Sequence, residues 1–459
     1  MSGRTRTRLL ALALAATTLL AVLTGRALAH GGSLRGSSSS SLSVPLWLFL
    51  LTGGGVVSAS FLLASFVTDR TLIGAIHDWR RRPATLDDRL ALVVRGVGLA
   101  GLVAVVAVGL VGPSTPEQNL AILVVWVGWW AGFTSTTYLF GNAWPALNPW
   151  RTMGDLLPTL GADYPERLGA WPSVVGLLAL VWLEVVSPLA SDAELLASVV
   201  LVYTAITLAG TAVYGTDRWF GTVDPVARVF RYYGRIAPVR RTDSGIEVTL
   251  PGARLAETKL VTDVDEVAFV VALLWVTTYD GLVATGLWGD AVRPVVETGV
   301  PARAAYLVAL LGGYALFLGV YWLAAAVSRR ADDTYLTATA IARRFTPSLL
   351  PIAAGYHLAH YLDYFLALSP ALLGALSAPL DPPTAVRLVL PAWFSGLEMA
   401  FVLLGHLLAV WVAHTTAYRL FPGRLQAVRS QYALVVVMIL YTMTSMWIVS
   451  QPPVDPPYV

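Results

Sequence analysis

The sequence contains no cysteine, which excludes disulfide bonds, thiolate catalysis and zinc or iron–sulfur sites held by cysteine. Charged residues are also scarce, at 13% of the 459 residues, about half of the roughly 25% found in soluble domains. Three enzyme signatures are missing as well: the H-E-x-x-H zinc motif, the G-x-S-x-G nucleophile elbow and the P-loop. We therefore expect neither an ATP-driven pump nor a serine hydrolase of the usual kind.

Apolar runs of about 20 residues, the length that crosses a hydrocarbon core, take the place of the missing charge. The sequence predicts an all-α, polytopic membrane helix bundle of about ten transmembrane helices, with a lipid bilayer as its surroundings. The predicted spans are 44–67, 90–113, 118–140, 168–189, 192–214, 265–288, 303–326, 346–370, 391–418 and 432–450. The net charge is only +3 and the arginines are spread over short loops, so no nucleic-acid partner is expected.

The N-terminus has the pattern of a secretory signal peptide at residues 1–29. Three arginines in the first eight residues precede an apolar run and an A-x-A site at 27–29. The alternative is an uncleaved first anchor. Cleavage would leave His30 as the first residue, whose amine and imidazole can chelate copper, followed by a Gly/Ser-rich extracellular linker at 30–43.

The distribution of arginine predicts the orientation of the chain. With the mature N-terminus outside, the arginine-rich loops are cytoplasmic, as the positive-inside rule requires. The 289–302 loop departs from this pattern, and the tail at 451–459 is extracytoplasmic like the N-terminus. The longest cytoplasmic loop, 215–262, contains the β-favouring stretch IEVTL, which predicts a small hairpin.

Four of the six histidines lie in the eighth and ninth predicted spans, namely His357, His360, His406 and His414. Ionisable side chains are costly inside a bilayer, so their presence indicates a functional site. A rise of 1.5 Å per residue places five side chains between roughly 16 and 25 Å from the cytoplasmic edge; they are His357, His360, His406, Asp280 and Asp363. The sequence thus predicts a site near the bilayer midplane.

Within this predicted site, the three histidines are candidate ligands of a divalent metal of unknown identity. Asp280 or Asp363 would complete the coordination or act as a general base. Glu184 in the fourth span lies at similar depth and is a further candidate, whereas His414 is expected near the inner surface. The same residue types also suit a proton relay or a solute path, or they hold helices together by hydrogen bonds.

The segment FGNAWPALNPWRTM directly follows the third span and predicts a turn at the membrane interface. Asn142 and Asn148 can cap its backbone, and Trp144, Trp150 and Arg151 are typical interface anchors. A re-entrant turn and a rigid cytoplasmic turn both fit this pattern.

Several motifs resemble one known family. They are AHG before the first span, NPWRTM after the third, TTYDG in the sixth, AHY in the eighth, GHLLAVWVAH in the ninth, and the closing QYALVVVMILYT run. In this order they are similar to the prokaryotic polytopic membrane proteins named fenitrothion hydrolases. The resemblance implies metal- or water-assisted cleavage of an organophosphorus ester, with His360, His406, His414 and Asp280 at matching positions.

Three classes of function stay open at this point. The first is a membrane-embedded hydrolase in which a His/Asp-bound metal activates water for attack on a phosphoester. The second is a transporter of a metal ion or small solute, with His30 as an external collector. The third is a membrane scaffold or assembly factor, in which the polar cluster only fixes helix packing.

Overall fold

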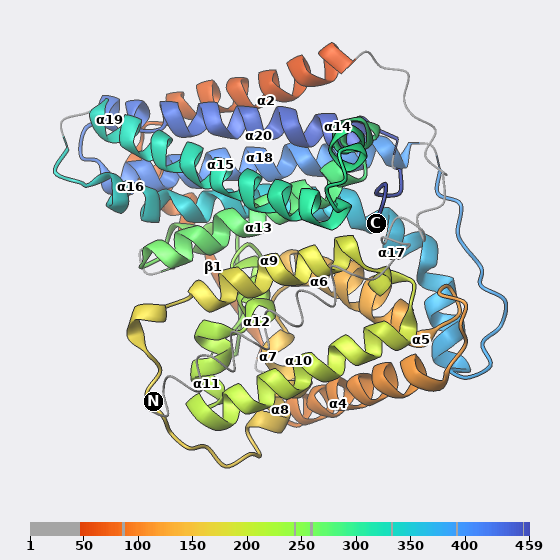
Figure 1. Cartoon of the computed structure of the whole chain (residues 1–459). Helices are drawn as coiled ribbons and strands as arrows, with labels where there is room; N and C mark the ends of the chain where they lie inside the picture. The colour runs from red at the N-terminus through yellow and green to blue at the C-terminus, as the bar shows by residue number, and fades with distance from the viewer. Residues whose placement is uncertain are drawn as a thin grey trace, which may run out of the picture.

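The computed structural model describes residues 46–84, 88–242, 245–257, 260–331, 334–391, 393–452 and 454–459. The predicted signal peptide, the Gly/Ser-rich linker and His30 lie outside these residues. Within them, the chain forms a bundle of long helices with one small sheet (Figure 1).

The first half of the chain contains α2 (Leu46–Phe66), α3 (Arg70–His77), β1 (Arg80–Ala84), α4 (Asp88–Val111), α5 (Leu120–Ile122), the π-helix η2 (Leu123–Phe133), α6 (Thr134–Leu139), α7 (Trp144–Leu147), α8 (Pro149–Gly154), η3 (Glu166–Leu168), α9 (Trp171–Val186), η4 (Pro188–Ala190), α10 (Ala193–Tyr214), α11 (Thr216–Arg218), η5 (Trp219–Val223) and α12 (Pro225–Tyr233). The second half contains β2 (Val239–Thr242), β3 (Gly245–Thr249), η6 (Ala253–Ala256), α13 (Val264–Val283), α14 (Gly286–Glu297), α15 (Ala302–Arg330), α16 (Ala338–Phe345), η7 (Thr346–Leu349), α17 (Leu350–Ser377), α18 (Phe394–Leu420), α19 (Arg424–Arg429) and α20 (Tyr432–Ser450).

Helices occupy all ten segments that the sequence predicts as spans. Among the described residues, seven helical segments are long and apolar enough to cross a membrane: α4, α5–η2–α6, α10, α13, α15, α18 and α19–α20. A part of α2 and α3 form an eighth candidate, bent by 117°. At 16 residues α9 is shorter, and α17 carries the polar residues of the predicted site. The apolar helices fit an integral membrane protein, and the count of ten stays a prediction.

The helices form two groups that α13 and α17 join (Figure 1). The upper group contains α2, α15, α18 and α20, and the lower group contains α4, α9 and α10. Helix α13 packs against α9, α15 and α17, and almost all of its side chains are buried. Helix α17 packs against α18 in the upper group and against η2 in the lower one. Residues of α13 and α17 can therefore contact helices of both groups.

Two glycines allow α17 and α18 to cross closely. A Cβ atom on Gly355 would lie 2.6 Å from the carbonyl oxygen of Phe401, and one on Gly405 would lie 2.5 Å from that of Pro351. Small residues at such a crossing let two backbones approach within a membrane. The crossing fixes the position of the helical turns that carry His357 and His406.

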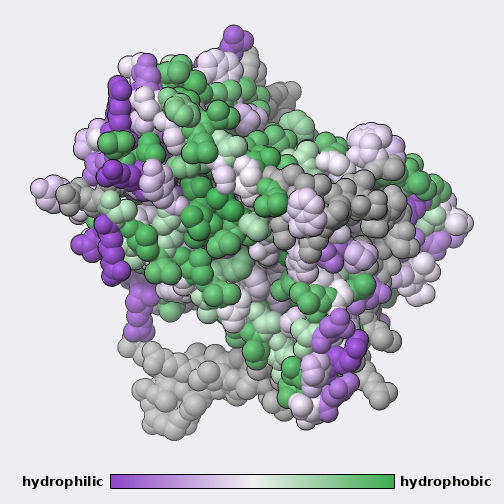
Figure 2. Space-filling model, turned by 90° about the horizontal axis from the view of Figure 1, so that it is seen from above, coloured by the Kyte–Doolittle hydropathy of each residue, from purple (hydrophilic) through white to green (hydrophobic). Residues whose placement is uncertain are grey.

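The outer surface of the upper group is apolar along its helices. Figure 2 shows hydrophobic side chains across the middle of this face and hydrophilic ones gathered mainly toward its sides. On α15, Val308, Leu316 and Leu323 are each more than 60% exposed. Such an apolar surface is what contact with acyl chains requires.

The predicted hairpin in the 215–262 loop is confirmed, because β2 and β3 pair as antiparallel strands. The sequence did not predict β1, which adds to the other edge of β3 and gives the order β1-β3-β2. The buried carboxylate of Glu247 lies 2.7 Å from Nη2 of Arg240 and 3.9 Å from Nη1 of Arg80. These contacts join the 215–262 loop to the segment after α3.

Candidate functional site

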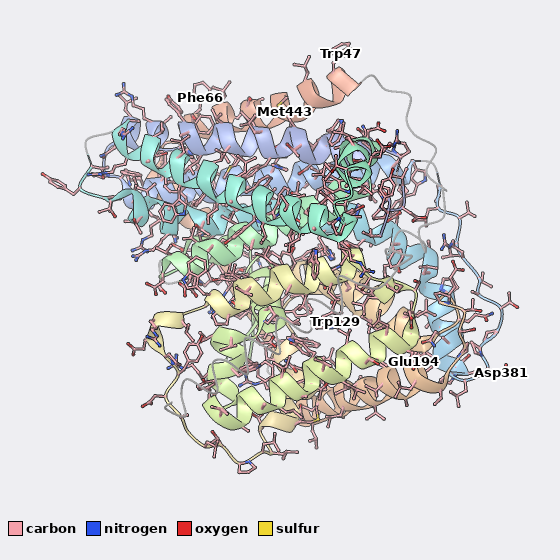
Figure 3. The ribbon with its side chains drawn as sticks, viewed as in Figure 1. Trp47, Phe66, Trp129, Glu194, Asp381 and Met443 are labelled. Carbon is pink, nitrogen blue, oxygen red and sulfur yellow. The ribbon has the colours of Figure 1, made fainter. Side chains whose placement is uncertain are left out.

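A cavity of about 560 Å³ lies within the lower group of helices, bounded by α4, η2, α9, α10, α12, α13 and α17. Its volume is within the range of roughly 300–1,000 Å³ that small-molecule sites occupy. Figure 3 labels Trp129 between α9 and α10, on the cavity wall. The aromatic residues of the lining are Trp126, Trp129, Trp130, Phe133, Trp144, Trp150, Tyr203, Phe230 and Tyr361. We call this space the aromatic cavity.

The rings of Trp129, Trp144 and Phe230 pack together although they come from three different elements. The centroid of Phe230 lies 5.0 Å from that of Trp144 and 5.5 Å from that of Trp129. Within the described part of the chain, the buried indole N–H groups of Trp129 and Trp144 have no hydrogen-bond acceptor. These two donors are available to water or to a ligand oxygen.

The side chain of Asp280, on α13, lies in the wall of the aromatic cavity. Its Oδ2 atom accepts a hydrogen bond of 2.8 Å from the hydroxyl group of Tyr361. The Nε2 atom of His360 lies 3.5 Å from the same oxygen. The structure therefore brings together Asp280 and His360, as the sequence predicts, and adds Tyr361.

His357 is fully buried behind Tyr361. Its ring stacks on the Tyr361 ring with centroids 4.6 Å apart, and its Nδ1 atom lies 3.1 Å from the hydroxyl oxygen of Tyr138. The ring of Trp130 contacts both His357 and Tyr361 edge-on. This arrangement assigns His357 a role in holding Tyr361, because His357 is not among the lining residues.

The other predicted site residues lie apart from Asp280. The Nδ1 atom of His406 donates a 2.8 Å hydrogen bond to the Val402 carbonyl group on its own helix. The Nε2 atom of His414 lies 3.0 Å from the carbonyl oxygen of Val67, which separates it from the predicted site as expected. Asp363 is half-buried on α17 and is not part of the lining.

The structure does not gather the predicted metal ligands His357, His360 and His406. Throughout the described part of the chain, no three His, Asp or Glu side chains form a group that could hold a metal ion. The two α17 histidines face different partners, since one contacts Tyr138 and the other Asp280. The divalent metal stays a prediction.

Glu184, on α9, supplies a second carboxylate to the lining, and the described lining includes no lysine, arginine or histidine. The rest of the wall is mostly aliphatic and aromatic. Two lining residues, Val97 and Leu376, are 59% and 53% exposed. The lining therefore continues onto the outer, apolar surface of the bundle.

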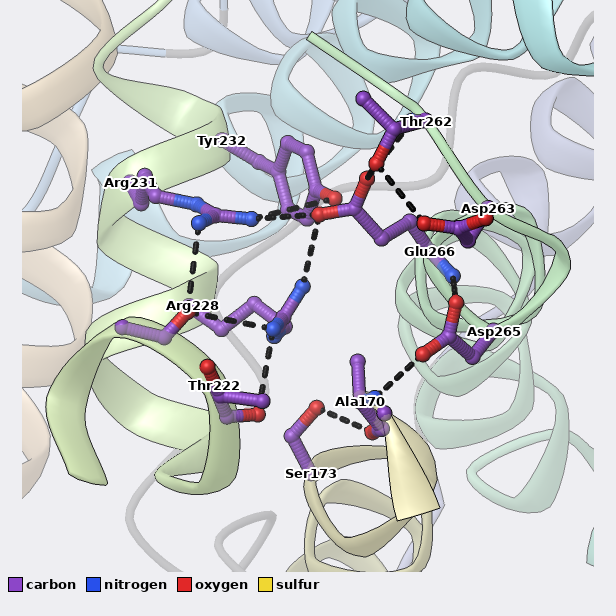
Figure 4. Close-up of polar contacts among 12 residues, drawn as sticks. Ala170, Ser173, Thr222, Arg228, Arg231, Tyr232, Thr262, Asp263, Asp265 and Glu266 are labelled. Carbon is purple, nitrogen blue, oxygen red and sulfur yellow. Dashed lines mark hydrogen bonds and ion pairs between the residues drawn. The ribbon is translucent and has the colours of Figure 1, made fainter. Parts of the chain in front are cut away.

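A polar network lies at the opposite end of α13 (Figure 4). The Oε1 atom of Glu266 lies 3.3 Å from Nη1 of Arg228 and 3.0 Å from Nη2 of Arg231. The backbone N–H of Thr262 donates a 2.7 Å hydrogen bond to Oε2 of the same carboxylate. Because α12 carries both arginines and the lining residue Phe230, this network ties two walls of the aromatic cavity together.

Asp224 precedes α12 and is buried next to the cavity wall. It accepts hydrogen bonds from the hydroxyl group of Tyr203, which lines the cavity, and from the backbone N–H of Ala227. Burial raises the pKa of the Asp224 carboxyl group to about 6. Asp224 thus caps the start of α12, and its hydrogen-bond donors among the described residues are uncharged.

The tryptophans of the cavity are site residues that the sequence did not predict. Five of the 16 tryptophans line the cavity: Trp126, Trp129, Trp130, Trp144 and Trp150. Their signal in the sequence is the density of tryptophan in WVGWW and in AWPALNPW, separated by a short stretch. The predicted caps are confirmed, since Asn142 and Asn148 accept hydrogen bonds from the backbone N–H groups of Trp144 and Arg151.

No family model, no curated protein and no solved structure matches this chain. The resemblance to the fenitrothion hydrolases therefore stays an expectation from the motifs alone, and the function is argued from the geometry of the site.

Proposed function

We propose that this chain is a multi-pass protein of the cell membrane that binds a lipophilic small molecule in the aromatic cavity and moves it through the bilayer. The observation that carries this proposal is the cavity itself, which is apolar and aromatic and has the carboxylates Asp280 and Glu184 in its wall. Sites for small molecules commonly combine apolar walls with a few placed polar groups. In the proposed orientation, both mature termini are extracytoplasmic, the arginine-rich loops are cytoplasmic, and ten helices span the membrane.

The length of the cavity supports transport. Its lining includes Pro149 and Trp150, which follow the predicted inner end of the third span, and Leu372 and Leu376, which follow the predicted outer end of the eighth span. One lining thus contains residues near both predicted edges of the bilayer. Transport further requires that the two sides open alternately.

Two glycines of α4 provide a matched test of this proposal. Gly101 lines the cavity, and a Cβ atom there would meet no atom within 4 Å. Gly96 has the same free space but is exposed and outside the lining. We expect Gly101→Phe to block the cavity without a clash and Gly96→Phe to leave it unchanged.

The measurement is binding of three arylated probes of similar size to the purified protein, followed by tryptophan fluorescence. The probes are tetraphenylphosphonium, tetraphenylborate and the neutral triphenylphosphine oxide. Uptake of any bound ion into proteoliposomes then separates transport from binding alone. Binding that is lost in Gly101→Phe and kept in Gly96→Phe supports the proposal. Equal binding in both variants, or no binding of any probe, would overturn it.

A hydrolase is the second candidate, and one contact favours it. His360 and Asp280 form an acid–base pair, with Nε2 and Oδ2 3.5 Å apart, beside a cavity large enough for an aryl ester. Such a pair can take a proton from a water molecule that attacks phosphorus. No step is assigned to a metal, because the described residues offer no group of three ligands.

The hydrolase candidate is tested with an aryl phosphotriester that releases nitrophenol. His360→Ala should lower the rate roughly 100-fold or more while the protein stays monodisperse. Metal content, compared between wild type and the His360→Ala/His406→Ala double variant, tests the predicted metal in the same preparation. Loss of the folded protein in His360→Ala would instead support the third class, a scaffold in which these residues fix helix packing.

A further inference from the structure

We infer that the molecule recognised by the aromatic cavity is a lipophilic organic cation, such as a protonated aryl amine or a quaternary ammonium ion. This inference rests on the proposed function, since it names the class of ligand for the same cavity.

The charge of the lining is the first argument. Two carboxylates, Asp280 and Glu184, lie in the wall, and the described lining contributes no cationic side chain; His360, whose Nε2 atom lies 3.5 Å from Oδ2 of Asp280, is outside the lining. The remaining surface is almost entirely apolar. A carboxylate that borders an apolar space interacts strongly with an ion of opposite charge there, because little water screens the pair. An anionic ligand would meet repulsion in the same place.

The aromatic rings are the second argument. Cations are attracted to the faces of aromatic rings, most strongly to tryptophan, and this is how proteins recognise quaternary ammonium groups. The five lining tryptophans come from η2, α7 and α8, so they surround the space from more than one side. The tilted contacts among Trp129, Trp144 and Trp150 leave ring faces turned in different directions.

The apolar walls also separate this ligand class from a metal ion. A small inorganic cation must exchange its hydration shell for several oxygen or nitrogen ligands. In the described part of the chain, no three His, Asp or Glu side chains form a group that could hold a metal ion. An organic cation carries its own apolar surface and needs only one or two carboxylates, which the cavity supplies. The exposed lining residues Val97 and Leu376 further place the edge of the cavity at the lipid-facing surface, where lipophilic cations partition.

The test compares two aspartates. Asp280→Asn removes the charge from the cavity wall, and the amide oxygen of asparagine can still accept the hydrogen bond from Tyr361. Asp363→Asn is the matched control, because Asp363 lies on a neighbouring helix outside the lining. Glu184→Gln is a second variant of the wall. Size-exclusion chromatography establishes that each variant is folded.

We expect tetraphenylphosphonium to bind wild type roughly tenfold or more tightly than tetraphenylborate, which has the same shape and the opposite charge. Asp280→Asn should weaken binding of the cation by roughly tenfold and change the affinity for triphenylphosphine oxide by less than about twofold. Asp363→Asn should change neither. If only Glu184→Gln folds, the same expectation applies to that variant.

The outcomes separate this inference from the proposed function. Suppose that the neutral or the anionic probe binds, that Gly101→Phe abolishes this binding, and that the cation does not bind. This result overturns the cation inference and leaves the cavity as the binding site. An equal loss of the cation in Asp280→Asn and Asp363→Asn overturns it as well. If Gly101→Phe reduces the binding of none of the three probes, the proposed function itself is wrong.

Discussion

Glu266 and Asp280 are carboxylates on the same helix, roughly 20 Å apart along its axis, and their surroundings differ in charge. Glu266 contacts the guanidinium groups of Arg228 and Arg231 and the backbone of Thr262. Asp280 contacts the hydroxyl group of Tyr361 and the ring of His360, and it lies in the wall of a cavity. Helix α13 thus has a charge-compensated end and an end that faces an open volume.

The difference indicates separate roles for the two ends. A partly buried carboxylate between two arginines is a structural contact, because its charge is matched within the protein. A carboxylate in the wall of an apolar cavity gains most from a ligand or a proton that enters that cavity. We therefore propose Asp280 as the functional residue of α13, whereas Glu266 ties α12 to α13.

The largest expected effect comes from breaking the charge-compensated end. Glu266→Ala leaves the guanidinium group of Arg228, whose side chain is only 3% exposed, without its carboxylate. Removing one partner of a buried ion pair costs about 3–5 kcal/mol. We expect a large drop in the thermal midpoint of the detergent-solubilised protein, measured by tryptophan fluorescence.

The matched control for this variant is Glu257→Ala. Glu257 pairs with Arg235, but the two side chains are 45% and 32% exposed, and exposed pairs contribute at most about 1 kcal/mol. A similar thermal midpoint for both variants would show that the network in Figure 4 does not stabilise the bundle.

A pH-dependent effect of intermediate size is expected at Asp224, a third carboxylate with a tyrosine partner. Burial raises the pKa of Asp224 from 3.8 to about 6. An acid with a raised pKa binds its proton more tightly in the folded state, so its contribution to stability is full below pH 4 and is lost as the pH rises to 6. Over that interval the loss is on the order of 2–3 kcal/mol.

Asp224→Asn removes this dependence, because asparagine has no proton to release and still caps α12. The variant should therefore gain stability relative to wild type as the pH rises from about 4 to 7. Thermal midpoints at both pH values give the comparison. A difference between variant and wild type that stays the same at the two pH values would contradict the assignment.

The sequence predicts the positions of the helices better than it predicts the site. Each apolar run carries its own signal, so helices occupy all ten predicted segments. Asp280 and His360 could be paired because depth along a helix follows from residue number. The rotation of each helix about its axis does not follow from depth. His406 consequently shares a predicted depth with His360, while its Nδ1 atom contacts the Val402 carbonyl group on its own helix.

The cavity could not be predicted, because it depends on how elements distant in the chain pack. The WVGWW stretch is π-helical, and the AWPALNPW segment folds against α4. A Cβ atom on Gly98 would lie 1.8 Å from the carbonyl oxygen of Leu147, so the glycine permits this contact. Tryptophan in a membrane protein usually indicates an interface, and only the tertiary structure shows that these five face an internal volume.

The smallest expected effect tests whether Asp280 carries a charge. Tyr361→Phe removes the 2.8 Å hydrogen bond to Oδ2 of Asp280 and keeps the ring that stacks on His357. Hydrogen bonds to charged acceptors contribute about 1.5–3 kcal/mol, and those to neutral acceptors about 0.5–1.5 kcal/mol. Tyr314→Phe is the reference, because Tyr314 lies on α15 and its hydroxyl group donates to a neutral acceptor on α13, the carbonyl oxygen of Ala268. A larger loss of thermal stability in Tyr361→Phe than in Tyr314→Phe is expected for an ionised Asp280. Equal losses would mean that Asp280 is protonated when no ligand is bound, and a cation would then have to displace that proton before it binds.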